Sequence, residues 1–554
     1  MIDPNAPMES SYVVAGTRPD ARSEVADDPL AVTFAQLIAR QSEVFGGREL
    51  VVDGSTRMTY AEFNSHVIDC ARSLMAIGVE PGDRVAVWAP NCLDWLVAAI
   101  GTSATGAVLL PMNSRFKGAE SADVIRRTKP RVLFTVGGFL DNDYPAMLRA
   151  AASEGDLDGL RIVVLDAGTG STGEDGDLSL DEFLALGRQV SVDAAVQRRD
   201  AVSAHTVSDL MLTSGTSGRP KAVMTTHHQN VLGYTRLAQH IRLRSGERIN
   251  ATLPFFHNFG YKAGFLVSAM VGGTCVIESV FDPVRLVRLI EEERISVLMG
   301  TPTLFTSLLS SEERHAAELS SLRLSFVGGA MVARELLERL RAELTPQVVT
   351  GYGLSELAGA VSLTPPEFEP DRIDWSGQLI EGVRVRIVDE FGEDVPRGRP
   401  GEILAHGECV MRGYLDDPRS AAEAVDHDGW LHTGDIGILD KEGYLRITDR
   451  KKDMFIVGGF NAYPAEIERL LLLHPAIAQV AVVGMADERL NEVAAAFVVP
   501  APGTDLQPET VIQWARENMA NYKVPRRVEL VDQLPTNASM KVLKHELRAR
   551  LAST

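Results

Sequence analysis

Hydroxyl side chains, glycines and a lysine are concentrated in one short stretch of the chain, at residues 213–221. These residue types suit a polyphosphate, because glycine lets backbone N–H groups turn toward an anion, hydroxyls donate hydrogen bonds and lysine adds a positive charge. The apolar residues 210–212 predict a buried strand that ends at this stretch. The candidate phosphate-binding residues are Thr213, Ser214, Gly215, Thr216, Ser217, Gly218 and Lys221.

The spacing in this stretch is not that of a Walker A loop, G-x-x-x-x-G-K-[ST], because Lys221 is followed by Ala222. On turn chemistry alone, a solvated Ser/Gly loop between two strands is the commoner outcome. The order T-S-G-T-S-G-x-P-K, however, resembles the phosphate-binding signature of the adenylate-forming enzymes, which include acyl-CoA synthetases, luciferase and peptide-synthetase adenylation domains. Ala222 departs from that signature, which usually has glycine at this position.

A second group of such residues follows the strand predicted at 347–350. Residues 351–356 are G-Y-G-L-S-E, in which a tyrosine ring can stack on adenine, a hydroxyl can bind phosphate and a glutamate can hold Mg²⁺. The order resembles the superfamily's Y-G-x-T-E, and a turn with a packed tyrosine is the alternative. The resemblance implies a catalytic Glu356 that binds Mg²⁺ together with Thr213. The further nucleotide-binding candidates are Gly328, Gly329, Ala330, Gly351, Tyr352, Gly353 and Ser355.

Two motifs nearer the C-terminus suit a ribose. W-L-H-T-G-D at 430–435 resembles the superfamily's W-x-x-T-G-D, and a carboxylate at Asp435 can accept hydrogen bonds from both ribose hydroxyls. D-R-K-K-D at 449–453 resembles D-R-x-K-D, which implies that Arg450 also reaches the ribose and that Lys452 is a hinge.

Charge runs are usually solvated faces. Here the sequence that follows, with Gly458 and Gly459, matches the superfamily as well, and the resemblance places those glycines on the face used with CoA.

The segment 534–541, L-P-T-N-A-S-M-K, resembles the loop L-P-x-x-x-x-G-K that carries the catalytic lysine of the superfamily. The resemblance makes Lys541 the candidate: its ammonium would hold the substrate carboxylate against the α-phosphate and offset charge in the transition state. Met540 stands where glycine is usual, so a conformation that needs glycine would be lost there. We expect the loop to tolerate Met540; a nucleotide-binding protein disabled by it is the alternative.

Residues 254–264, P-F-F-H-N-F-G-Y-K-A-G, are the expected acyl site. His257 matches the superfamily's aromatic ring between the acyl pocket and the nucleotide, and a satisfied core histidine is the alternative. Together with residues 281–283 and 458–461, this stretch resembles actinobacterial ligases of steroid-ring catabolites, which activate a hexahydroindanedione propanoate. A medium- or long-chain fatty acid is the alternative substrate.

The elements that must position these residues follow a regular order. Helical and strand patterns alternate up to residue 376, which predicts an α/β fold of parallel-type sheets with helices on both faces. Ligands of such sheets sit beyond the carboxyl ends of strands, so residues 213–221, 328–330 and 351–356 are expected to face one crevice. Short strands from residue 377 predict a β-rich subdomain.

A fresh α+β pattern after residue 453 predicts a small mobile C-terminal domain. The expected division is a disordered leader at 1–28, an adenylation domain at 29–449 and the C-terminal domain at 450–554.

Composition excludes several classes of function. A net charge of −20 argues against a general nucleic-acid or anionic-membrane binder. The cysteines, at 70, 92, 275 and 409, show no metal spacing and fit a reducing cytoplasm. The N-terminus has no signal-peptide pattern, and the apolar stretch 95–112 predicts a buried helix and strand rather than a membrane span. A homodimer is expected on base rates alone.

The resemblance, which covers about residues 30 to 548, implies an ATP-dependent acyl-CoA ligase. A carboxylate and Mg-ATP would give an acyl-adenylate and pyrophosphate, after which CoA would give acyl-CoA and AMP. The implied cofactors are ATP, Mg²⁺ and CoA. An adenylating enzyme that does not use CoA is a further alternative.

Overall fold

The computed structural model describes residues 30–140, 142–165, 176–214, 220–330, 332–367, 369–373, 375–451, 453–457, 460–487, 489–536 and 542–552. The leader predicted at 1–28 lies outside these residues. The side chains of Ser214 and Arg450 are also outside the description, although both backbones belong to strands.

The sheet that carries the expected phosphate loop has the strand order β19-β9-β8-β4-β3-β5-β6-β7. β3 (Arg84–Trp88) is apolar and almost wholly buried, as a strand covered by helices on both faces must be. The pairs from β8 through β6 are parallel, whereas β9 returns antiparallel to β8. The other strands are β4 (Val108–Pro111), β5 (Val132–Val136), β6 (Arg161–Leu165), β7 (Leu178–Ser179), β8 (Val207–Ser214), β9 (Pro220–Thr226) and β19 (Gly413–Tyr414).

A second sheet has the order β16-β15-β14-β13-β12-β10-β11-β1-β2. It is parallel from β1 through β14 and antiparallel at both edges, where β1 pairs with β2 and β14 pairs with β15. Its strands are β1 (Glu49–Asp53), β2 (Thr56–Thr59), β10 (Arg248–Ala251), β11 (Thr274–Ile277), β12 (Val297–Gly300), β13 (Leu324–Val327), β14 (Gln347–Leu354), β15 (Leu357–Leu363) and β16 (Gln378–Leu379).

Helix α3 (Leu93–Thr105) joins the two sheets into one core. It contacts β1 of one sheet and β3 and β4 of the other. It is apolar on nearly every face, which is the pattern of a helix buried on all sides. The apolar stretch 95–112 is therefore a buried helix followed by a strand, as predicted. None of the described helices is long and apolar enough to span a bilayer.

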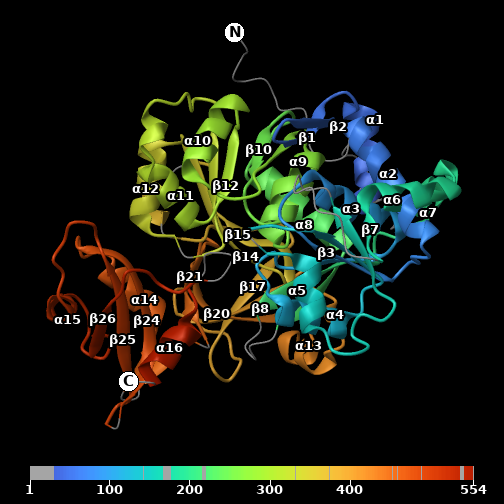
Figure 1. Cartoon of the computed structure of the whole chain (residues 1–554). Coiled ribbons are helices and arrows are strands. Elements are labelled where there is room, and N and C mark those ends of the chain that lie inside the picture. Colours follow the sequence, from blue (N-terminus) through green and yellow to red (C-terminus); the bar gives the residue numbers. More distant parts are fainter. Residues whose placement is uncertain are drawn as a thin grey trace.

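The remaining helices cover the sheets or connect strands (Figure 1). They are α1 (Phe34–Phe45), α2 (Tyr60–Ala76), α4 (Gly118–Thr128), α5 (Tyr144–Ala151), α6 (Leu180–Leu186), α7 (Val192–Ala201), α8 (His227–His240), α10 (Pro283–Glu292), α11 (Pro302–Ser310), α12 (Arg334–Glu343) and α13 (Pro418–Ala424). Short 3₁₀ turns lie at Gly187–Gln189, Glu312–His315 and Pro370–Arg372. This arrangement confirms the predicted α/β class.

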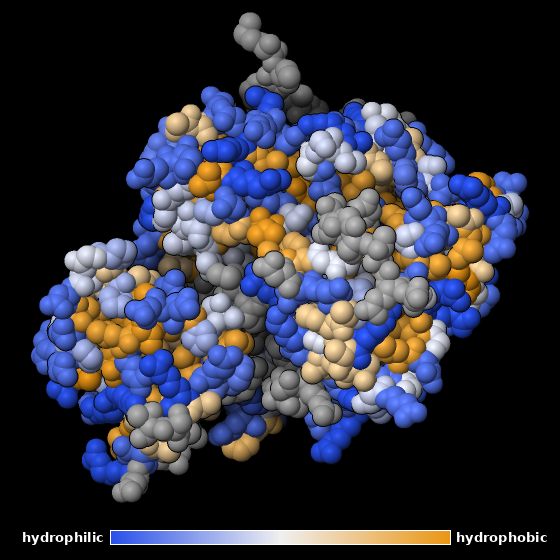
Figure 2. Space-filling model, viewed as in Figure 1, coloured by the Kyte–Doolittle hydropathy of each residue, from blue (hydrophilic) through white to orange (hydrophobic). Residues whose placement is uncertain are grey.

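Two further sheets follow toward the C-terminus, shown in orange and red in Figure 1. An antiparallel sheet contains β17 (Arg384–Val388), β18 (Gly401–His406), β20 (Leu431–Leu439) and β21 (Leu445–Arg450). The last sheet contains β22 (Phe455–Val457), β23 (Phe460–Ala462), β24 (Ile477–Asp487), β25 (Asn491–Pro500) and β26 (Arg527–Leu530). It packs with α14 (Pro464–Leu471), α15 (Pro508–Asn518) and α16 (Lys544–Ala552). Figure 2 shows this last part as a rounded lobe separated from the larger body by a groove.

The helix that begins within the expected acyl segment is not a regular α-helix. It is a π-helix, η2 (Phe259–Leu266), that continues into α9 (Val267–Met270). Its hydrogen bonds span five residues, so the N–H of Val267 donates to the carbonyl of Lys262. The first turn presses on the preceding segment, since a Cβ on Gly260 would lie 2.3 Å from the carbonyl oxygens of Leu253 and Pro254. Hydrophobic periodicity alone does not separate such a helix from an α-helix.

Candidate functional site

Two motifs that the sequence predicts to bind one nucleotide are in direct contact. The hydroxyl of Tyr352, on β14, donates to Asp435 Oδ2, on β20, across 2.6 Å. Asp435 is 7% exposed, and Gly434 before it has a φ of +69°, which favours glycine. A phenol and a carboxylate are thus fixed side by side where a ring could stack on adenine and an acid could accept from ribose.

The glycines on either side of Tyr352 are required by close backbone contacts. A Cβ on Gly351 would lie 2.7 Å from the carbonyl oxygen of Ser362, and one on Gly353 would lie 2.6 Å from the carbonyl oxygen of Gly359. The β14–β15 register shifts on both sides of Gly353. Such irregularities change the direction in which the following side chains point, and Ser355 is among the residues that follow.

Glu356 lies beside the strand that leaves the expected phosphate loop. The hydroxyl of Tyr414 donates to Glu356 Oε1 across 3.1 Å, and Lys221 Nζ lies 4.7 Å from the centre of the Tyr414 ring. Burial raises the pKa of Tyr414, and the Glu356 carboxylate adds to the effect, so the phenol is a stable donor at neutral pH. Sequence reasoning missed Tyr414, because it reaches this place through the pairing of β19 with β9.

At its base, the expected phosphate loop is a β-hairpin. Thr213 on β8 pairs with Lys221 on β9, and the Thr213 hydroxyl points at the Lys221 carbonyl across 3.5 Å. Strand pairing therefore fixes the two ends of the loop. Gly215, Thr216, Ser217 and Gly218 lie outside the described residues.

The expected acyl segment contacts the G-Y-G-L-S-E motif directly. Asn258 Nδ2 donates to Ser355 Oγ across 3.2 Å, and Asn258 Oδ1 is buried with no partner among the described residues. His257 beside it stacks obliquely on Phe256, with ring centres 4.5 Å apart. Burial lowers the pKa of His257 to about 4, so the ring is neutral at physiological pH.

The turn at residues 328–330 completes the cluster. Gly329 has a φ of +83°, which a side chain would strain. A Cβ on Gly328 would lie 3.2 Å from the ring of Phe259, the first residue of η2, while Ala330 is exposed. Printed contacts through Phe259, Asn258 and Tyr414 thus connect the turn after β13, the segment after β14 and Lys221 on β9, although β9 belongs to a different sheet from β13 and β14.

Residues 38–415 match the family of AMP-binding enzymes, and residues 466–541 match the AMP-binding enzyme C-terminal domain. The chain belongs to the AMP-binding enzyme family.

Individual relatives agree with this assignment. A 3-[(3aS,4S,7aS)-7a-methyl-1,5-dioxo-octahydro-1H-inden-4-yl]propanoyl:CoA ligase of Rhodococcus jostii is 43% identical over 518 residues, covering 93% of this chain and 98% of the relative. A ligase of the same name from Mycobacterium tuberculosis is 43% identical over 494 residues, covering 89% of this chain and 94% of the relative. The solved structure of ATP-bound MatB from Rhodopseudomonas palustris has a TM-score of 0.78 at 27% identity, covering 93% of this chain and 98% of that one. This AMP-binding enzyme is an ATP-dependent acyl-CoA ligase, with ATP and CoA as substrates.

In this ligase, Glu356 is suited to Mg²⁺. No group of three or more histidines, cysteines or acids that could hold a metal occurs among the described residues. Mg²⁺ needs no such cage, because it is usually held by one or two carboxylates together with substrate phosphates. Glu356, held in place by Tyr414 near Lys221, fits that pattern.

The segment around the expected hinge is attached on both sides. Lys451 Nζ lies 2.8 Å from Glu402 Oε2 on β18, and Asp453 Oδ1 accepts from Arg548 Nη2 on α16 across 2.9 Å. Backbone pairing places Arg450 opposite Asp435, on the same pair of strands. Lys452, Gly458, Gly459 and Lys541 lie outside the described residues.

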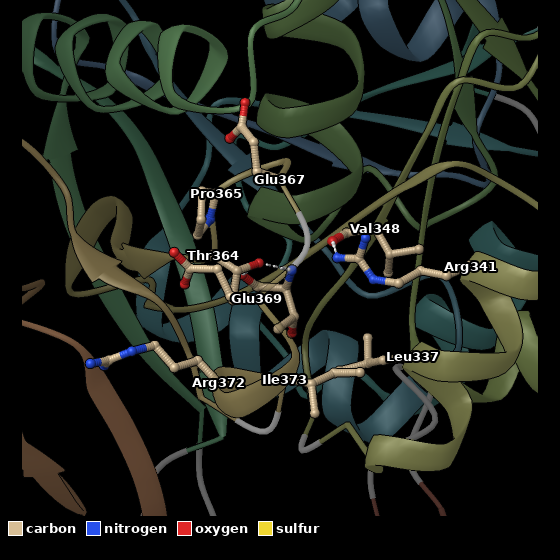
Figure 3. A pocket seen from close by; sticks show the side chains of 10 residues that line it. Leu337, Arg341, Val348, Thr364, Pro365, Glu367, Glu369, Arg372 and Ile373 are labelled. Carbon is tan, nitrogen blue, oxygen red and sulfur yellow. Dashed lines mark hydrogen bonds between the residues drawn. The ribbon is translucent and has the colours of Figure 1, made fainter.

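A separate pocket lies between α12, β14 and the segment after β15, and none of the predicted site residues lines it (Figure 3). Several of its polar groups already have partners within the protein: Arg341 Nη2 donates to the carbonyl of Val348 across 2.7 Å, and the N–H of Thr350 donates to Thr364 Oγ1. Arg372 is paired with Asp440 and Glu442, which do not line the pocket. This pocket is not part of the nucleotide site.

Proposed function

We propose that this acyl-CoA ligase activates a steroid-derived alicyclic propanoate of the hexahydroindanedione type. The observation that carries the proposal is the pair of relatives named for that acid, each 43% identical over about nine-tenths of the chain. A feruloyl-CoA synthase of Amycolatopsis is less similar, at 34% identity. The residues of the expected acyl site support a bulky apolar substrate, because Phe256 and Phe259 stand on either side of His257 and Asn258.

In the first half-reaction, a carboxylate oxygen attacks the α-phosphorus of ATP, the bond to the β-phosphate oxygen breaks, and pyrophosphate leaves. Lys541 would offset the charge on the acid and the α-phosphate, and the hydroxyls and Lys221 of the hairpin loop would hold the phosphates. Asp435 and Arg450 would hold the ribose, and Tyr352 would contact the adenine. Glu356 and Thr213 would hold Mg²⁺, which neutralises phosphate charge when bound.

In the second half-reaction, the CoA thiol attacks the acyl carbonyl, its proton passes to solvent, and AMP leaves. We propose that residues 450–554 turn about Lys452 between the two steps, which withdraws Lys541 and brings Gly458 and Gly459 to the site. Such gating lets one crevice serve two reactions. The attachments of Lys451 to Glu402 and of Asp453 to Arg548 support a pivot between them. A homodimer and a cytoplasmic location stay predictions.

The test is pyrophosphate release with Mg-ATP, CoA and a panel of acids: the bicyclic diketone propanoate, medium- and long-chain fatty acids, and ferulic acid. We expect release with the bicyclic propanoate and its loss in Lys541→Ala. Release with a fatty acid instead would overturn the substrate proposal while leaving the ligase intact.

Two further results of the same assay would support the remaining alternatives. AMP release that does not require CoA would indicate an adenylating enzyme that does not use CoA. No release with any acid, together with a gain of activity in Met540→Gly, would indicate a protein disabled at Met540.

A further inference from the structure

A charged pair lies in the interior of the body, with Lys262 in the expected acyl segment 254–264 and Asp209 on β8. The side chains of Lys262 and Asp209 are both 0% exposed, and Lys262 Nζ lies 2.8 Å from Asp209 Oδ1. Lys262 Nζ also donates to Asn230 Oδ1 across 2.7 Å. Burial lowers the pKa of Lys262, and the Asp209 carboxylate counteracts that effect.

Both charges are embedded in a polar shell. Asp209 Oδ1 also accepts from the Thr225 hydroxyl across 3.1 Å, and Asp209 Oδ2 accepts from the Ser208 hydroxyl across 2.6 Å. Asn230 Nδ2 donates to the carbonyl of Thr226 across 2.9 Å and lies 3.0 Å from the hydroxyl oxygens of Ser208 and Thr225. Multiple hydrogen bonds of this kind fix the positions of the charges rather than merely neutralising them.

The members of the network come from elements with different proposed tasks. Ser208 and Asp209 on β8, with Thr225 and Thr226 on β9, form the base of the hairpin whose other end is the expected phosphate loop. Lys262 comes from η2, three residues after Phe259, which packs on the turn at Gly328. The network therefore joins the phosphate-loop hairpin to the wall of the expected acyl site.

Stability alone is a weak reason for this pair, because a buried ion pair can often be replaced by apolar residues of similar volume without loss. A better reason for the pair is that its hydrogen bonds are directional and so fix the position of η2 relative to β8. η2 has π-type hydrogen bonds, a geometry that is rare in proteins as a whole but frequent at functional sites. A change to α-type bonding would shift the residues of η2 relative to one another, and a shift that separates Lys262 from Asp209 and Asn230 would leave buried charges unpaired, so the pair favours the π-helical register.

We propose that Lys262 and Asp209 are a positioning pair, which holds the π-helical wall of the acyl site in register with the phosphate-loop hairpin. The inference rests on the functions proposed above for the hairpin loop and for η2. Neither residue touches a reacting atom. Their task is to keep the sites for the carboxylate and for the phosphates at a fixed separation, on which in-line attack depends.

The test uses the full-length double variant Lys262→Met/Asp209→Asn, because a single substitution leaves one buried charge unpaired and threatens folding. The matched control is Arg323→Met/Glu247→Gln. In that pair, Arg323 Nε donates to Glu247 Oε1 across 2.6 Å, and the pair lies at the amino ends of β13 and β10, away from the site. Both variants remove one ion pair from the same body.

The measurements are Tm, Mg-ATP affinity by calorimetry, and kcat/KM for pyrophosphate release. Affinity and kcat/KM are measured at a temperature well below the unfolding transitions of both variants. We expect the Lys262/Asp209 variant to bind Mg-ATP more weakly and to lose about tenfold to a hundredfold in kcat/KM, since small misplacements of bound groups cost that much. The control variant should have a lower Tm than the wild type but keep its Mg-ATP affinity and its kcat/KM within about twofold, because its ion pair is independent of the site.

Unchanged Mg-ATP affinity and unchanged kcat/KM in the Lys262/Asp209 variant, whatever its Tm, would overturn the proposal. If the wild-type protein turns over no acid, the proposed function fails, but the comparison of Mg-ATP affinity between the two variants still decides the task of the pair.

Discussion

The hydroxyl of Tyr352 and the carboxylate of Asp435 share a 2.6 Å hydrogen bond, although 83 positions separate them in the chain. The contact unites two motifs that were each expected to bind part of a nucleotide. It also gives the two residues separable tasks, since the Tyr352 ring can contact a base while its hydroxyl orients an acid toward a ribose.

Substitution of these two residues should therefore have graded effects. Tyr352→Phe keeps the ring and removes one hydrogen bond to a charged group, which is worth about 1.5–3 kcal/mol, so we expect Mg-ATP to bind about tenfold to a hundredfold more weakly. Asp435→Ala removes the acceptor for the ribose and should be worse than Tyr352→Phe. Calorimetric titration with Mg-ATP and with AMP measures both effects. Equal affinities in wild type and Asp435→Ala would show that Asp435 does not bind the nucleotide.

The contact between Tyr414 and Glu356 leads to a second prediction. Glu356→Gln keeps a hydrogen-bond acceptor for Tyr414 but removes the charge that would hold Mg²⁺. We expect kcat for pyrophosphate release to fall about a hundredfold or more, a typical loss when transition-state charge stabilisation is removed. Tyr414→Phe keeps the charge and should lose about tenfold or less.

A magnesium titration of both variants and the wild type is the measurement. If Glu356→Gln retains the wild-type dependence on Mg²⁺, the metal is held elsewhere.

Much of this site could be predicted from sequence because its chemistry is local. Gly329 and Gly434 have positive φ, and Gly351 and Gly353 have neighbours too close for a side chain, so each has a backbone reason to be glycine. Such requirements appear in the sequence as short motifs. The strands that precede the motifs were also predictable, because each contains a short apolar run.

Residues that reach the site through long-range pairing were not predictable. Tyr414 arrives because β19 pairs with β9, and nothing in the spacing between Tyr414 and Lys221 signals it. Asp209 and Lys262 lie 53 positions apart, and each looks unremarkable within its own element. The π-helical form of η2 was not predictable either, because its apolar pattern over eight residues also fits an α-helix.

A half-buried histidine at the expected acyl site, His257, makes stability depend on pH. Burial lowers the pKa of His257 to about 4, below its ordinary value of 6.5, so between these values the unfolded chain binds more protons than the folded one. Stability should thus rise with pH from about 4 to about 6.5 and be lost as pH falls through that window. His227, whose pKa burial lowers to about 3, acts in the same direction.

Glu278 acts in the opposite direction, because burial raises its pKa to about 7 and its contribution to stability is lost as pH rises. The contribution of His257 is therefore best isolated as a difference. Urea unfolding of wild type and His257→Gln from pH 4 to 8 should give a slope of stability against pH that differs by up to one proton, about 1.4 kcal/mol per pH unit. Parallel curves for the two proteins would mean that His257 is not held neutral by burial.

Asn258 connects the expected acyl site to the phosphate side through its hydrogen bond to Ser355. Because the amide nitrogen donates to Ser355 Oγ, the hydroxyl proton of Ser355 is directed elsewhere and can be donated to a phosphate oxygen. Asn258→Ala removes this orientation, and we expect kcat/KM for Mg-ATP in pyrophosphate release to fall about tenfold. Asn258→Asp places an anion beside the phosphates and should be more damaging than Asn258→Ala.

Thioester formation from preformed acyl-adenylate and CoA provides the internal control for these variants, because no phosphate is transferred in that step. Both variants should keep this rate near that of the wild type. If Asn258→Asp and Asn258→Ala reduce pyrophosphate release equally, the amide does not face the phosphates. A loss confined to the thioester step would instead assign Asn258 to the position of the acyl group.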